Sequence, residues 1–147
     1  MELSRSLCIQ IVTSTIWLGL GIALIVMGAI YKDDCPIQPY IPIFLLVTGV
    51  IHLMAVLIHF LKCVLETCGM VLQGIIGMFG FAWFVVGNIW VFGLYSQNKG
   101  LNICDLNLYN FAFGFLIFEY VVAGISFICI CCGSVALSTS HLYERIE

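Results

Sequence analysis

Charge is what this 147-residue chain has least of. Five Lys and Arg and eight Asp and Glu make up 9% of the sequence, whereas about a quarter of the residues in a soluble domain are charged. Hydrophobic residues make up 63%, and the mean hydropathy is +1.15. These values exclude a soluble globular protein. The net charge is only -3 and no run of Lys or Arg occurs, so we expect no nucleic-acid partner.

Catalytic signatures are absent as well. The sequence contains no Ser/His/Asp set, no phosphate-binding loop and no metal triad, and its three histidines are His52, His59 and His141. We therefore expect that the chain is not an enzyme and that it binds no cofactor and no metal.

Long apolar runs, in contrast, fill most of the chain. They cover about residues 8–31, 43–61, 71–95 and 108–135, and each exceeds the ~18 apolar residues of a membrane-spanning helix. The connectors between them are short. The sequence therefore predicts an all-α integral membrane four-helix bundle that forms one domain, residues 1–147, in the plasma membrane or an endomembrane. The first run lacks a small-x-small cleavage site, so we interpret it as a retained helix.

The eight cysteines divide between the two sides of such a bundle. With four spans, both termini and the second connector share one side. The opposite side carries only Cys35, in the first connector, and Cys104, in the third. One cysteine in each connector predicts a disulfide in an oxidising compartment, with short outer loops and cytoplasmic termini. Two unrelated thiols are the alternative.

The other cysteines lie at or near the predicted cytoplasmic face. Thiols at such positions are candidates for S-acylation, which we predict for Cys63, Cys68, Cys129, Cys131 and Cys132. The spacing of these cysteines matches no standard zinc pattern. In the tail, Tyr143 and Ile146 fit a Tyr-x-x-bulky sorting signal, although so short a motif often occurs by chance.

All three prolines fall in the first outer connector or at its end. Pro36, Pro39 and Pro42 recur every third residue, which is the repeat of polyproline II and predicts a ridge of stacked rings. Pro42 also suits the first turn of a helix, where its missing N–H group needs no partner.

Three segments make the chain similar to a known family. They are Gly28–Ile43, which contains the string Cys-Pro-x-Gln-Pro-Tyr-Ile-Pro, the run Trp83–Trp90, and Cys104 together with Leu108–Phe113. In these segments the chain resembles the vertebrate transmembrane protein 272-like family, and the resemblance covers most of the chain. It implies a small four-span membrane protein and its topology, and it implies no mechanism.

Polar residues inside the spans are the candidates for function, because hydrocarbon offers them no partner. Counted from the outer helix ends at ~1.5 Å per residue, His52 lies about 14 Å deep, Asn88 about 11 Å and Glu119 about 17 Å. We predict one intramembrane polar layer, in which His52 is a candidate partner for Glu119. In the alternative, Asn88 joins helices, His52 is satisfied within the bundle, and Glu119 is held by one hydrogen bond without further role.

Small residues predict close contacts between helices. The first span has a four-residue repeat, and the third span has four glycines on related positions: Thr15, Gly19 and Ala23, and Gly74, Gly77, Gly80 and Gly87. Such stripes serve either an oligomer interface or packing within one bundle. We favour packing for the third span and leave both possibilities open for the first.

Two functions are compatible with these features. One is a homo-oligomeric channel or transport-type protein for small ions that uses the polar layer, since four spans leave no room for a water-filled route within a single bundle. The other is a structural or organising protein in the manner of claudins or MARVEL-domain proteins, which acts through packing and partner interactions in the lipid bilayer. The outer connectors are too short for a claudin, which weakens the second analogy.

Overall fold

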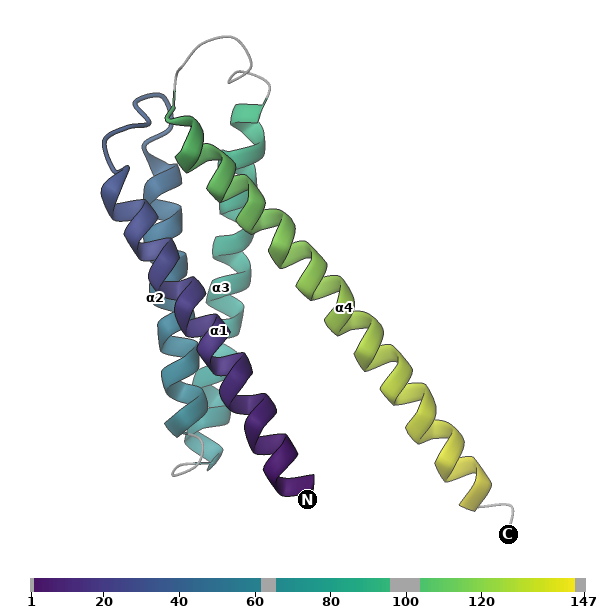
Figure 1. Cartoon of the computed structure of the whole chain (residues 1–147). Helices are drawn as coiled ribbons and strands as arrows, with labels where there is room; N and C mark the ends of the chain where they lie inside the picture. The colour runs from purple at the N-terminus through teal and green to yellow at the C-terminus, as the bar shows by residue number, and fades with distance from the viewer. Residues whose placement is uncertain (1, 62–65, 96–103, 145–147) are drawn as a thin grey trace. The chain divides into compact units, whose positions relative to one another are not determined.

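The computed structural model describes residues 2–61, 66–95 and 104–144, and the side chains of 8–61, 67–95 and 104–134. Within these ranges all regular structure is helical (Figure 1). The helices are α1 (Glu2–Ile30), α2 (Tyr40–Leu61), α3 (Glu66–Tyr95) and α4 (Leu106–Glu144). The predicted all-α membrane fold is confirmed.

The described residues contain four helical segments that are long and apolar enough to cross a membrane. They are Cys8–Ile30, Tyr40–Leu61, Thr67–Tyr95 and Leu106–Ser134, so each predicted apolar run corresponds to one span. The chain is a multi-pass membrane protein.

The loop between α1 and α2 is shorter than its proline repeat suggested. The helix α2 begins at Tyr40, so Pro42 lies in its first turn, as predicted. The backbone N–H of Ile41 still donates to the carbonyl of Gln38, at 3.2 Å. A polyproline ridge of three prolines is therefore wrong, because the third proline is already helical.

The chain divides into two compact units, Met1–Ala112 and Phe113–Glu147. The first contains α1, α2, α3 and the first residues of α4. Within it, α2 contacts both α1 and α3 (Figure 1). The second unit is the continuation of α4, a single helix through Glu144.

Glycines let the backbones of α1 and α2 approach closely. A Cβ atom added to Gly49 would lie 2.7 Å from the carbonyl oxygen of Gly21, and one added to Gly28 would lie 2.7 Å from that of Pro42. Small residues at facing positions permit this kind of contact. The predicted stripe of α1 is not the one that makes it, because a Cβ on Gly19 would meet no atom within 4 Å.

The contact between α2 and α3 centres on Phe44, which is fully buried. Its ring lies where a side chain at Gly87 would be. Its carbonyl oxygen accepts the indole N–H of Trp83 at 3.3 Å and the hydroxyl of Thr48 at 2.6 Å. Of the predicted α3 stripe, Gly87 and Gly80 face α2, whereas Gly74 and Gly77 have no such neighbour within 4 Å.

We expect Gly87→Val to destabilise the protein by about 1–3 kcal/mol, because a side chain there overlaps the ring of Phe44 and forces overpacking. Gly93→Val is the matched control in the same helix, since a Cβ at Gly93 meets no atom within 4 Å. Thermal unfolding in detergent measures both. Equal effects of the two substitutions would contradict the packing of Gly87 on Phe44.

Candidate functional site

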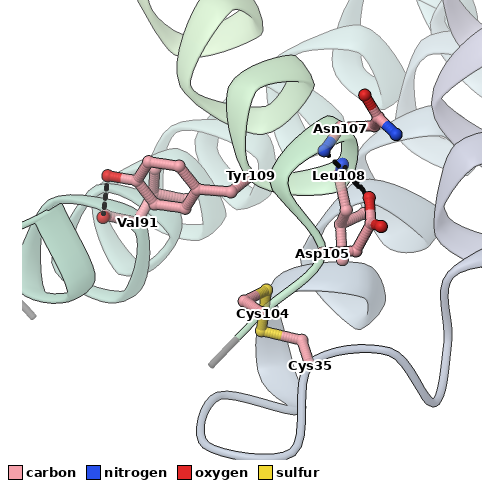
Figure 2. The surroundings of a disulfide bond; sticks show 7 residues. All are labelled: Cys35, Val91, Cys104, Asp105, Asn107, Leu108 and Tyr109. Atoms are coloured by element: carbon pink, nitrogen blue, oxygen red, sulfur yellow. Dashed lines mark hydrogen bonds between the residues drawn. A yellow bond between two sulfur atoms is a disulfide. The ribbon is translucent and has the colours of Figure 1, made fainter. Parts of the chain in front are cut away.

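A disulfide joins Cys35, in the loop between α1 and α2, to Cys104, just before α4 (Figure 2). The two cysteines are 69 residues apart in sequence and both are buried. The predicted pairing is confirmed. The bond therefore joins the first loop to the residues just before α4, at one end of the helices.

Backbone hydrogen bonding reinforces the same connection. The N–H of Asp105 donates to the carbonyl of Asp34 at 3.0 Å, next to the disulfide on both sides. We call Asp34, Cys35, Cys104 and Asp105 the outer clamp, after the side of the membrane on which the sequence predicts them. Two adjacent links between the first loop and the start of α4 restrict their relative rotation more than the disulfide alone does.

The outer clamp also starts α4. The carboxylate of Asp105 accepts the N–H groups of Asn107 at 2.8 Å and Leu108 at 3.1 Å, as an N-cap residue does (Figure 2). One turn later, the hydroxyl of Tyr109 donates to the carbonyl of Val91 in α3, at 3.3 Å. The first turn of α4 is thereby attached to both the first loop and α3.

The predicted polar-layer residue His52 bonds to its own helix. Its Nδ1 lies 2.8 Å from the carbonyl oxygen of Thr48, and because a carbonyl can only accept, Nδ1 carries the proton and donates. The ring centroid lies 5.3 Å from that of Trp17, in α1. This arrangement supports the interpretation of His52 as a histidine satisfied within the bundle.

The other two residues of the predicted layer lie in different units. The amide Nδ2 of Asn88 donates to the carbonyl of Phe84, one turn earlier in α3, at 2.7 Å. Glu119 belongs to the second unit, near the middle of the span Leu106–Ser134. The layer of His52, Asn88 and Glu119 at a common depth stays a prediction.

The cysteines predicted to be S-acylated are exposed where the structure describes them, namely Cys68, Cys129, Cys131 and Cys132. Exposure is what acylation requires, and the modification itself stays a prediction. Cys63 lies outside the described residues.

Of the predicted sorting signal, Tyr143 lies in α4 and Ile146 is outside the described residues. In the described parts of the chain, no group of three or more His, Cys, Asp or Glu is placed to hold a metal ion.

Two residues that the structure makes notable, Asp105 and Gln73, were not singled out from the sequence. Asp105 stands directly before an apolar run, which is the usual signal of an N-cap. Gln73 lies two residues inside the third apolar run, and its side-chain oxygen is buried without a hydrogen-bond partner. A search limited to the middle of each span overlooks such a residue, because it lies nearer the helix end.

The chain is similar to Transmembrane protein 272 of Homo sapiens. The two sequences are 26% identical over an alignment of 160 positions, gaps included, which covers 89% of this chain and 85% of the relative. This similarity confirms the resemblance to the transmembrane protein 272-like family that the sequence motifs indicated. No family model matches the chain. No solved structure matches it either.

We expect Cys35→Ser to lower the stability of the protein by about 2–4 kcal/mol, because the disulfide closes a long loop in the unfolded chain. Cys68→Ser, at an exposed cysteine, is the matched control and should shift stability by less than about 0.5 kcal/mol. Thermal unfolding in detergent gives the difference. Alkylation of Cys35 and Cys104 in the unreduced wild-type protein would show that the pair is not bonded.

Proposed function

We propose that this four-span membrane protein assembles into a homo-oligomer and acts as a channel or transport-type protein for small ions, without catalytic activity. The observation that carries the proposal is the position of Glu119.

Glu119 lies near the middle of the span Leu106–Ser134. At ~1.5 Å per residue it is about 20 Å from either end, which is as deep as a bilayer allows. A carboxylate costs several kcal/mol at this depth, and acids inside spans mark ion or proton routes more often than amides do. Carboxylates in a pore favour cations, so small cations are the expected substrate.

Helix surfaces in the first unit support assembly. A Cβ on Gly19 of α1, or on Gly74 or Gly77 of α3, would meet no atom within 4 Å. Backbones exposed by small residues are the usual contact surface between membrane helices. Because one four-helix bundle has no space for water along its axis, an oligomer is needed to surround a conducting route.

A structural or organising role is the second candidate, and the bonding of His52 and Asn88 favours it. Each donates to a carbonyl of its own helix, at 2.8 and 2.7 Å. Polar groups that are satisfied in this way stabilise a bundle without transporting anything. The channel proposal therefore depends on Glu119 and on the oligomer, and the two functions differ in whether the reconstituted protein conducts.

We expect purified wild-type protein to conduct small cations in planar bilayers, and Glu119→Gln to lose most of that conductance because the amide cannot carry the charge. Glu119→Asp is the matched control, which keeps the carboxyl group and should retain conductance. Single-channel recording gives the comparison, and cross-linking in nanodiscs gives the oligomeric state.

Two outcomes would contradict the channel. One is a strictly monomeric protein in nanodiscs, since a monomer has no route for ions. The other is a well-folded oligomer without conductance, which would instead support the organising role. Equal conductance of wild type and Glu119→Gln would show that Glu119 takes no part.

A further inference from the structure

A cavity of about 450 Å³ lies in the first unit, at the end of the helices opposite the outer clamp. Residues of α1, α2 and α3 line it. Besides the indole of Trp17, its polar groups are two amides, two hydroxyls and two imidazoles, from Gln10, Thr13, Ser14, His52, His59 and Gln73. Its volume is within the range of sites for small molecules, ~300–1,000 Å³.

The polar groups occupy one leaflet of the bilayer. At ~1.5 Å per residue, Gln10 lies about 3 Å from the start of the span Cys8–Ile30, and Gln73 lies about 9 Å from the start of Thr67–Tyr95. By the same count His52 is about 14 Å from the end of Tyr40–Leu61. The polar wall thus extends from the headgroup region well into the acyl-chain region. A membrane lipid has its polar groups and the adjoining part of its apolar chain or ring system at these depths.

Gln73 needs a hydrogen-bond donor. Its Oε1 is buried and has no hydrogen-bond partner. A buried acceptor in this state costs free energy, and lipid tails supply no donor. The terminal torsion of glutamine is soft, so the amide can turn its oxygen toward a donor that enters the cavity. The missing group is therefore a hydroxyl or an N–H.

The described residues that line the cavity are uncharged, because they include no Lys, Arg, Asp or Glu. Among them, a phosphate group would find no cation of the kind that normally holds it. The rest of the wall is apolar and includes Ile9, Val56 and the indole of Trp17, whose ring contacts that of His52. An uncharged molecule with a hydroxyl head and an apolar body therefore matches both the polar and the apolar part of the cavity wall.

We propose that this cavity binds a neutral, hydroxyl-bearing membrane lipid, with its hydroxyl group at the amide of Gln73 and its apolar body along Trp17 and Val56. Sterols and acylglycerols share this chemistry. The binding proposed here uses residues of the first unit, whereas the proposed ion conduction depends on Glu119 of the second.

Photolabelling of the full-length protein in phosphatidylcholine nanodiscs tests the site. Three diazirine probes are compared: a sterol, a diacylglycerol and a phosphatidylcholine. We expect the sterol or the diacylglycerol to label peptides that contain residues 9–17, 52–59 or 73, and the unlabelled lipid to compete. Whichever neutral probe labels these peptides identifies the source of the hydroxyl.

Two variants remove the site in different ways. Gln73→Leu deletes the amide and should lower labelling about fivefold, as the loss of one hydrogen bond predicts. Ala55→Leu fills the cavity and should lower labelling with the amide intact. Gln38→Leu makes the same change as the first variant in the outer loop and should leave labelling unchanged. Thermal unfolding confirms that each variant folds.

The proposal is overturned if neither neutral probe labels these peptides, or if the phosphatidylcholine probe labels them as strongly. It is also overturned if a folded Ala55→Leu variant is labelled like the wild type. A folded Gln73→Leu variant that keeps full labelling would remove Gln73 from the site.

Discussion

The structure depends on one constraint: in hydrocarbon, every backbone N–H and C=O group must find its partner within the protein. The helices meet this demand along their length through their own backbone hydrogen bonds. Several polar side chains likewise bond within their own helix. Thr15, Thr48, His52 and Asn88 each donate to the carbonyl one turn earlier in their own helix. Polar residues are therefore tolerated in the spans without requiring a partner on another helix.

Packing between helices has a different origin. Lipid tails are as apolar as the helix surfaces, so burial alone does not favour association, and close contact between backbones must provide the stabilisation. The facing glycines of α1 and α2 and the position of Gly87 on Phe44 supply such contacts. Outside the hydrocarbon the chain uses stronger links, namely the disulfide and the backbone bond between Asp34 and Asp105.

The two ends of the helices in the first unit differ in what they offer for function. The outer clamp joins the first loop to the start of α4, whereas the opposite end of the helices contains a cavity in which the Oε1 atom of Gln73 lacks a hydrogen-bond partner. The lipid binding proposed for that cavity and the ion conduction proposed for Glu119 involve different residues. The two proposals are therefore compatible in one protein.

The sequence by itself determined the four spans and predicted the pairing of Cys35 with Cys104, because hydropathy and the side on which each loop lies depend only on the order of residues. It did not determine which glycines make contacts: the four-residue repeat pointed to Gly19, whereas Gly21 and Gly28 face α2. Nor did it show the cavity around Gln73. Both depend on how each helix is rotated about its axis, and only tertiary packing decides that rotation.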